Sequence, residues 1–196
     1  MIALTLSGCR IYFRPIADTW EDAMMVTRWR NRDDARASFF CDDVVTPGSH
    51  SLFMARRDPH DLVWMVHRRV TLDKFPLGML SIIVDVKART GEYGRLYIDP
   101  EYKGQGYAKE AEFLMLWAAF EWLRLDSLWL DALTNNVAVL TLHDKTGWTR
   151  AGVDVPGHTN ERGPVQHMTY SREAWRDTGR GLFVTAFPDV GLPAWE

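Results

Sequence analysis

The sequence predicts a mixed α/β fold in which one mostly antiparallel, twisted central sheet is flanked by helices. Segments that alternate apolar and polar residues, as strands do, are interleaved with segments of helical spacing. A long apolar-rich helix, from Tyr107 to about Arg124, follows directly on a strand and a pair of glycines. No internal repeat interrupts this order. We therefore expect one domain over residues 1–174 and a C-terminal tail of unassigned structure over 175–196.

The composition limits the class of protein. With 196 residues, of which 46% are hydrophobic, the chain has enough apolar content for a full core. Its net charge of -3 argues against a broad nucleic-acid surface. No apolar run approaches the roughly 20 residues that span a bilayer. Cys9 and Cys41 make no disulfide framework, and the first residues do not have the pattern of a signal peptide. We expect a cytoplasmic protein without membrane or nucleic-acid partners.

The N-terminal half is expected to hold a first strand and three short helices before the main sheet. Cys9 to Ile16 alternates like a strand, and Pro15 stops it. Asp18 is expected to cap a helix that runs to Trp29. A second helix begins at Asp33, and Thr46 with Pro47 forms the N-cap and first turn of a third. Three consecutive strands are then predicted, the first two as a hairpin, at residues 62–70, 77–86 and 92–99.

The C-terminal half is predicted to complete the sheet. The helix from Tyr107 is apolar on more than one face, so it must be covered on more than one side. A strand at 127–133, a short helix at 136–145 with Gly147 as its C-cap, and strands at 148–155 and 165–172 follow. The aromatic residues of the tail, Phe183, Phe187 and Trp195, are expected either to cover a sheet edge or a second subunit of a homodimer, or to fold back on their own core.

The glycine pair lies in Tyr102-Lys103-Gly104-Gln105-Gly106-Tyr107-Ala108. Two glycines let the backbone curl so that consecutive N–H groups point inward, and the helix that starts there adds its positive end. Such a turn binds phosphate, although glycines also serve tight strand-to-helix turns for purely steric reasons.

Two separated motifs, in the expected order, resemble the GNAT superfamily of acetyl-CoA-dependent N-acetyltransferases. The glycine loop is similar to the family pattern of Arg or Gln, two residues, Gly, one residue, and Gly or Ala, with Lys103 in the first position. The stretch from Asn136 to Trp148 is similar to the family helix that lines the pantetheine arm, with His143 where Tyr is commonest. With the strand before them and the order of the elements, the resemblance covers roughly residues 10–172. The N-terminal segment looks like the subgroup of ribosomal-protein N-terminal and nucleotide-amino-sugar acetyltransferases.

The resemblance implies a site for acetyl-CoA as co-substrate. In the family, the strand here spanning Arg95 to Ile98 usually carries a bulge and splays from the next strand, so that its free backbone groups bind pantetheine and an amide near Tyr97 or Ile98 polarises the thioester carbonyl. Asn136 is an N-cap, a pantetheine partner, or both, and Lys145 meets a phosphate or complements the helix dipole. The implied cofactor-binding residues are Tyr97, Ile98, Lys103, Gly104, Gln105, Gly106, Tyr107, Ala108, Asn136, His143 and Lys145.

Amide formation from a thioester requires an uncharged amine, a polarised carbonyl and a proton for the departing sulfur. Glu92 stands where some family members carry a general base; otherwise it is a solvated acid at a strand end. His143 is the candidate acid, because imidazole titrates near neutral pH; otherwise it only packs there. No metal is expected, since His60, His67, His158 and His167 share no metal-like spacing.

The acceptor is expected on the side of the N-terminal helices. The candidate substrate-binding residues are Trp29, Arg30, Asn31, Arg36 and His50. An aromatic plane with Arg and His would stack a nucleobase or sugar and pair with phosphates. The competing interpretation places Trp29 on the core face of a helix and makes the arginines a solvated face paired with Asp33 and Asp34.

The function expected from these residues is direct transfer of an acetyl group to a primary amine of a small molecule, such as a nucleotide-linked amino sugar. Two alternatives stay open: acetylation of a protein N-terminus, as in the ribosomal-protein enzymes, and a non-catalytic acyl-CoA-binding domain that senses or bridges. Glu92 and His143 favour catalysis.

Overall fold

The structure, a computed structural model, describes residues 5–8, 10–69 and 75–188. Its strands are β1 (Leu6–Ser7), β2 (Ile11–Pro15), β3 (Asp61–Arg68), β4 (Gly78–Asp85), β5 (Thr90–Ile98), β6 (Ser127–Leu133), β7 (Thr149–Val153) and β8 (Val165–Ser171). They form one eight-stranded sheet in the order β1-β2-β3-β4-β5-β6-β8-β7. Neighbouring strands are antiparallel except β5 and β6, which run parallel. The mixed, mostly antiparallel sheet that the sequence predicts is confirmed.

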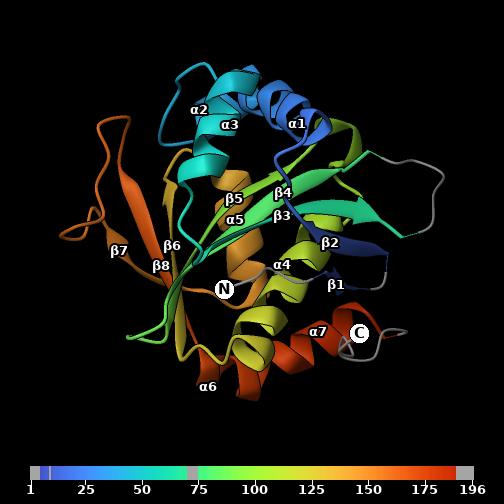
Figure 1. Ribbon diagram of the computed structural model, residues 1–196. Helices are drawn as coiled ribbons and strands as arrows, with labels where there is room; N and C mark the ends of the chain where they lie inside the picture. The colour runs from blue at the N-terminus through green and yellow to red at the C-terminus, as the bar shows by residue number, and fades with distance from the viewer. Residues whose placement is uncertain (1–4, 9, 70–74, 189–196) are drawn as a thin grey trace.

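The helices occupy both faces of this sheet (Figure 1). They are α1 (Trp20–Arg30), α2 (Asp33–Ser38), α3 (Pro47–Arg56), the 3-10 turn η1 (Pro100–Tyr102), α4 (Tyr107–Trp117), the π-helical η2 (Ala118–Trp122), α5 (Val137–Thr146), α6 (Arg172–Ala174), the π-helical η3 (Trp175–Gly179) and α7 (Arg180–Ala186). Figure 1 shows α1 to α3 together on one side of the sheet and α4 with α7 on the other.

The ends of the helices follow local sequence chemistry. Thr46 caps α3 as expected, in a capping box in which its side chain and that of Ser49 each accept from the other's backbone N–H. The cap of α1 is Thr19 rather than Asp18, because the Thr19 hydroxyl accepts from the Asp22 backbone N–H. The Asp18 carboxylate instead accepts from Ser51 of α3 at 3.1 Å. The prediction of Asp18 as the cap is therefore wrong by one residue.

The sheet is buried on both faces because its central strands alternate between two cores. In β3, Trp64 and its alternate neighbours join the core under α4, whereas Val63 and Met65 join a second core under α1 to α3. Each face thus excludes water, and a strand buried on both faces reads as a nearly continuous apolar run. Functional groups can therefore reach the sheet only where its strands separate or end.

The C-terminal residues pack on the core under α4. Trp175 is fully buried and Phe183 is 2% exposed. The rings of Phe183 and Phe187 lie 5.8 and 6.0 Å from that of Phe113, counted between centroids. These residues fold back on their own core, and Trp175 and Phe183 belong to the same core cluster as β2, β3 and α4. Cys9, the loop at 70–74 and Trp195 lie outside the described residues.

Candidate active site

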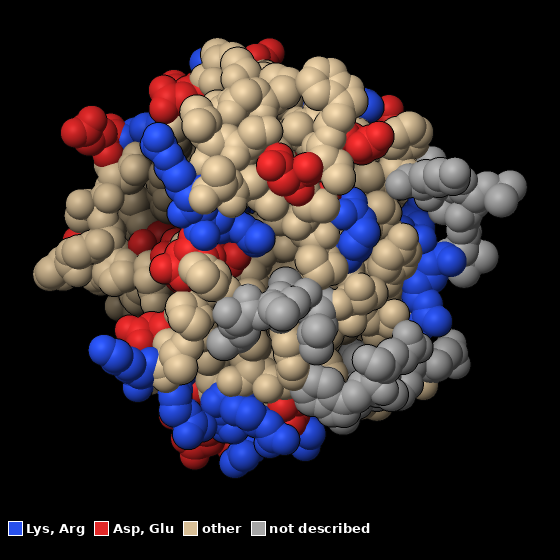
Figure 2. Space-filling model, in the orientation of Figure 1, with Lys and Arg blue, Asp and Glu red and all other residues tan. Residues whose placement is uncertain are grey.

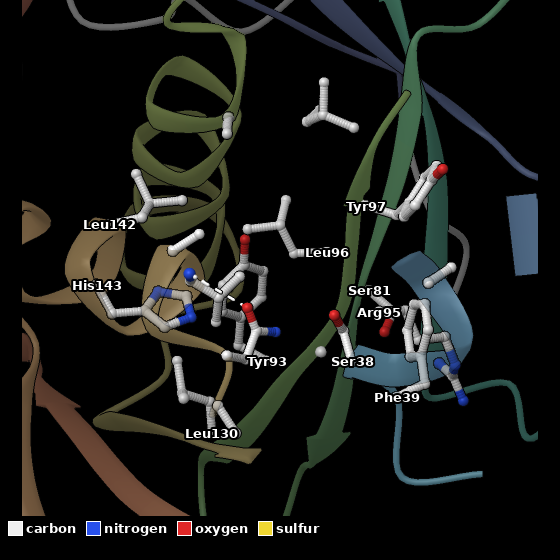
Figure 3. A pocket seen from close by; sticks show the side chains of 18 of the residues that line it. Ser38, Phe39, Ser81, Tyr93, Arg95, Leu96, Tyr97, Leu130, Leu142 and His143 are labelled. Carbon is white, nitrogen blue, oxygen red and sulfur yellow. Dashed lines mark hydrogen bonds between the residues drawn. The ribbon is translucent and has the colours of Figure 1, made fainter. Parts of the chain in front are cut away.

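A cavity of about 570 Å³ opens where β5 leaves β6. It has two halves, separated by β5 itself. His143, Tyr93 and Leu130 line the half beneath α4 and α5, whereas Ser38 and Arg95 line the half beneath the N-terminal helices. Figure 3 shows these two groups on opposite sides of the β5 ribbon. The cavity therefore joins the two faces of the sheet.

The opening between the two halves is produced by the geometry of β5. The parallel ladder with β6 extends only from Thr90 to Glu92. Farther along, the register against β4 shifts between Met79 and Ser81, and Arg95 adopts a positive φ of 53°. This is a β-bulge, and it bends β5 away from its parallel neighbour. The bulge and splay expected from the family resemblance are confirmed, and they leave backbone groups near Tyr97 and Ile98 without a partner strand on that side.

The glycine loop closes the end of this opening at the start of α4. Gly104 and Gly106 have φ values of +76° and +83°, which side-chain-bearing residues adopt at a cost of about 1–2 kcal/mol. A Cβ at Gly104 would meet nothing within 4 Å, so its backbone borders open space. Gly106 caps α4 in the left-handed conformation. The loop thus presents backbone and a helix N-terminus to solvent, as an anion site requires.

Arg10 braces the loop from the other end of the chain. Its Nε donates to Glu110 Oε2 at 2.8 Å, and its backbone N–H donates to Glu110 Oε1 at 2.6 Å. Its Nη1 donates to the carbonyl of Gln105 at 3.1 Å, and its guanidinium lies 4.7 Å from the centre of the Tyr107 ring. Glu110 is 1% exposed, so Arg10 also compensates a buried charge. The phosphate turn is held by a residue far away in sequence.

Lys103 is engaged with the N-terminal helices. Its Nζ donates to Asp34 Oδ2 at 2.9 Å, which ties the glycine loop to α2. The side chains of Lys103 and Asp34 are 55% and 37% exposed, so solvent screens this ion pair and it contributes little to stability. The pKa of Asp34 is lowered by hydrogen bonds from Lys103 and Arg32, although burial acts in the opposite direction. Lys103 and Asp34 both line the cavity, so their ion pair lies at its wall.

His143 is oriented by a buried carboxylate. Its Nδ1 lies 2.7 Å from Glu112 Oε1, and the ring is 3% exposed. Thr146 donates to the same oxygen at 2.8 Å. With Nδ1 engaged, Nε2 is the ring nitrogen left for the cavity that His143 lines. Glu112 comes from α4 and His143 from α5, so the pair forms only when both helices pack on the sheet.

The Tyr93 hydroxyl and the second carboxylate oxygen of Glu112, Oε2, also lie near His143. The ring of Tyr93 contacts it at 5.9 Å between centroids, and burial raises the pKa of Tyr93 well above its ordinary value. Among the residues that the structure describes, neither the Tyr93 hydroxyl nor Glu112 Oε2 has a hydrogen-bond partner. Tyr93 therefore remains a proton-bearing hydroxyl at the wall of the cavity, which it lines.

Glu92 enters the cavity from the opposite face of the sheet. It lies across from Ile83 in the antiparallel ladder and from Trp129 in the parallel one. Burial raises the pKa of Glu92 above its ordinary value, an effect that Arg95 opposes and Asp131 reinforces. In the described part of the chain, no hydrogen bond or ion pair engages this carboxylate. A half-buried carboxylate without a hydrogen bond or ion pair, and with a raised pKa, is suited to receive a proton.

The remaining predicted cofactor residues fall into two groups. Asn136 caps α5 by accepting from the Val139 backbone N–H at 3.4 Å, and it also lines the cavity. Tyr97 and Ile98 line it too, and burial raises the pKa of Tyr97 to about 12. Lys145 is exposed on the last turn of α5 and is not part of the cavity lining, so the helix-dipole interpretation accounts for its position.

The candidate acceptor residues separate in the structure, and only Arg30 lines the cavity. Its guanidinium lies 4.1 Å from the centre of the Phe39 ring, and burial lowers its pKa. Trp29 is fully buried, and its Nε1 donates to Asp99 at 2.9 Å, so stacking of a nucleobase on Trp29 has no exposed face to use. The core interpretation of Trp29 is the correct one.

The other three candidates have structural contacts. Asn31 exchanges two hydrogen bonds with the backbone of Val45, at 2.7 and 2.8 Å, and so fixes the connection before α3. Arg36 donates to the carbonyl of Asp42 at 3.1 Å. His50 is 3% exposed in α3, where burial lowers its pKa. The prediction that Asn31, Arg36 and His50 form one acceptor pocket with Trp29 is not supported by this geometry.

Several residues at the site were missed from the sequence. Glu112 carries a detectable signal, because an acid inside an apolar helix must find a partner when it is buried. Phe39 and Tyr93 carry none, since aromatic residues at these spacings are usually core. Asp131 lines the cavity from β6. It carries no signal either, because a polar residue in an alternating strand usually faces solvent.

The surface and the helices bear on other partners. On the face seen in Figure 2, basic side chains lie in several separate groups with acidic side chains among them, rather than in one continuous basic surface. Among the described helices, none has both the length and the apolar content to cross a membrane.

Comparisons with known proteins agree with this geometry. The family model described as acetyltransferase (GNAT) domain matches residues 10–149, which is more than half of the chain. A search of curated proteins finds no match. Among solved structures, a spermidine N-acetyltransferase from Vibrio cholerae in complex with CoA and spermine has a TM-score of 0.73 at 17% identity, over 86% of this chain and 99% of that one. A GCN5-related N-acetyltransferase from Brucella melitensis has a TM-score of 0.78 at 13% identity, over 96% and 88%. A GNAT-family acetyltransferase from Bacillus anthracis has a TM-score of 0.72 at 19% identity, over 87% and 99%.

Proposed function

This chain belongs to the GNAT family of acetyltransferases, and we propose that it moves the acetyl group of acetyl-CoA directly to a primary amine of a small, positively charged molecule. Acetyl-CoA fits the residues present. The glycine loop offers open backbone at Gly104 for the pyrophosphate, and the gap between β5 and β6 offers strand backbone for the pantetheine arm.

The observation that carries the acceptor proposal is the charge balance of the cavity. Two of its basic side chains are in ion pairs, Arg95 with Asp61 at 2.6 Å and Lys103 with Asp34 at 2.9 Å, whereas Arg30 lies over the Phe39 ring. The carboxylate of Glu92 has no such partner in the described residues. Glu92 and the neighbouring Asp131 therefore make the charge at their end of the acceptor half negative, and this favours a cationic amine there.

The chemical steps distribute over the two faces of the sheet. Glu92 takes a proton from the acceptor ammonium, directly or through water, and frees the nitrogen lone pair. That nitrogen attacks the thioester carbonyl carbon, whose oxygen accepts from a backbone N–H near Tyr97 or Ile98. As the amide forms, the nitrogen releases its second proton to water and the C–S bond breaks, and His143 Nε2 supplies the proton with which the sulfur leaves as a thiol. The Glu112 carboxylate holds the ring in place.

Direct transfer is favoured over a covalent enzyme intermediate. The described cysteine, Cys41, is exposed with its thiol 2.9 Å from Asp43 Oδ2, and it lies outside both sequence motifs. The spermine-bound Vibrio enzyme supports a cationic acceptor by analogy of fold alone, since its identity is 17%.

A nucleotide-linked amino sugar is the second candidate acceptor. Arg30 over Phe39, at the mouth of the acceptor half, would suit a phosphate beside a flat ring, although Trp29 no longer contributes to this pocket. Acetylation of a protein N-terminus and acyl-CoA sensing without catalysis are the remaining alternatives. The former would need peptide backbone to enter between α2 and β5.

The test is thiol release from acetyl-CoA across a panel of acceptors: spermidine, a short diamine, a nucleotide-linked amino sugar, an amino acid and a peptide. We expect the highest kcat/KM for the diamine or spermidine, and a rate that falls as the ionic strength rises. Preference for the sugar nucleotide would replace the first candidate by the second. Tight acetyl-CoA binding without thiol release on any amine would overturn the enzymatic proposal.

A further inference from the structure

Asp131, His158 and His167 meet in space although they are scattered in the sequence. Asp131 of β6 lies directly across from His167 of β8 in the antiparallel ladder. His158 reaches them from the connection between β7 and β8. Asp131 Oδ1 lies 2.8 Å from His167 Nδ1, and Oδ2 lies 2.8 Å from His158 Nδ1. The sequence spacing of the histidines, which shows no metal-like pattern, does not reveal that His158 and His167 meet at one carboxylate.

The cluster is tightly packed and walled on one side. The two imidazole rings lie 3.9 Å apart between centroids. The Trp129 ring contacts both, at 5.0 Å from His158 and 5.9 Å from His167. The side chains of His158, Asp131 and His167 are 26%, 14% and 12% exposed, respectively. An ion could reach this place from solvent and would still lose most of its hydration there.

The donor set is that of a transition-metal site. Two imidazole nitrogens and one carboxylate are the ligands that zinc takes in sites with three protein ligands, which leave a fourth position open. One candidate ligand atom from each residue lies within 4.8 Å of the others. Ligands of a tetrahedral zinc lie about 3.3 Å apart, which follows from metal–ligand distances of about 2.0–2.1 Å. Small rotations of these side chains would lengthen the 2.8 Å distances between the histidine nitrogens and the Asp131 oxygens to the spacing of metal ligands.

We propose that Asp131, His158 and His167 bind one divalent transition-metal ion of the zinc type. The ion ties the connection between β7 and β8 to the sheet beside the acceptor half of the cavity, which Asp131 also lines. The competing state is a metal-free cluster, in which both histidine rings donate hydrogen bonds to the Asp131 carboxylate. The two states differ in stoichiometric metal uptake, which is independent of acetyl transfer, so either proposal can fail without the other.

The experiment uses the full chain without a histidine tag, stripped with a chelator and dialysed against zinc or cobalt. We expect one equivalent of metal per chain by mass spectrometry and, with cobalt, visible absorbance typical of nitrogen and oxygen ligands. His158→Gln and His167→Gln should each weaken binding at least about tenfold. The matched control is His60→Gln, a histidine outside the cluster. Zinc should raise the melting temperature of the wild type and the control, but not of the two variants.

A variant that fails to fold would be recognised by circular dichroism. Asp131→Asn then provides the second test, because it keeps the side-chain shape and removes the charged ligand. Absence of stoichiometric uptake by the wild type would overturn the proposal. Uptake that His158→Gln, His167→Gln and Asp131→Asn leave unchanged would overturn it equally.

Discussion

At the residue scale, burial of the Glu112 carboxylate costs free energy that its hydrogen bonds must offset. Its side chain is fully buried, and an isolated charge there would be strongly destabilising. His143 and Thr146 both bond to its Oε1, at 2.7 and 2.8 Å. A carboxylate kept in the core at such cost suggests that it positions His143, which in turn faces the cavity.

His143→Ala should therefore lower kcat about 100-fold, because it removes the proton donor for the sulfur, and leave acetyl-CoA affinity nearly unchanged. Glu112→Gln keeps the size of the side chain and should lower kcat about tenfold through loss of ring orientation. Single-turnover kinetics and calorimetric titration of acetyl-CoA measure the two quantities separately.

The double variant separates positioning from general stabilisation. If Glu112 acts through His143, adding Glu112→Gln to His143→Ala should lower kcat no further. Additive losses would assign Glu112 a separate role. An unchanged kcat in His143→Ala would remove His143 from the mechanism and leave the Tyr93 hydroxyl as the nearest proton-bearing group.

Residue types near the site could be predicted when their signal is local. His143 and the two glycines stand within the two motifs, and the family resemblance singled out Glu92 by its place on the strand before the glycine loop. Trp29 could be either core or ligand, because a tryptophan on an amphipathic helix face satisfies both interpretations until burial is known. The meeting of Asp131 with two histidines depends on strand pairing and a loop path, which no sequence spacing encodes.

At the element scale, the glycine loop depends on backbone conformation rather than on side-chain contacts. Gly104 and Gly157 have φ values of +76° and +83°, and a Cβ at either position would meet nothing within 4 Å. The two glycines therefore carry the same local strain when substituted. They differ in place, since Gly104 borders the cavity and Gly157 lies in the connection between β7 and β8.

Gly104→Ala should weaken acetyl-CoA binding about tenfold, equivalent to about 1.4 kcal/mol, because the left-handed turn is strained and a methyl group stands where a phosphate would approach. Gly157→Ala should leave acetyl-CoA affinity unchanged. It should lower the melting temperature by about as much as Gly104→Ala does, because the two positions have similar backbone strain. Isothermal titration with acetyl-CoA measures the difference. Equal affinities in both variants would mean that the loop is a turn without a phosphate role.

Most elements were predictable because their start and stop signals are local. Thr46 with Pro47, Asn136 and Gly147 mark helix ends that the structure reproduces. The short edge strand β1 was not predicted, since two residues carry too little pattern. The π-helical turn at Ala118–Trp122 was also missed, because it continues the apolar helix with only a change of hydrogen bonding.

At the scale of the whole molecule, the two cores explain why the site is where it is. Each face of the sheet is sealed by helices, and the bulge in β5 opens one passage between them. The candidate base and acid enter that passage from opposite faces, Glu92 beneath α1 to α3 and His143 beneath α4 and α5. The family resemblance predicted the splay, whereas the charge balance of the acceptor half required the packed structure.

The central claim is that Glu92 receives the proton of the acceptor amine in this passage, and the pH dependence of kcat/KM tests it most directly. Burial raises the pKa of Glu92 above its ordinary value of 4.5, so the ionised base is present above the raised pKa and is lost as the pH falls through it. The wild type and Glu173→Gln, an exposed acid on α6, should both show this acidic limb. Glu92→Gln should be slower by about 100-fold and should lack the limb. A Glu92→Gln enzyme that retains both the wild-type rate and the limb would contradict the account.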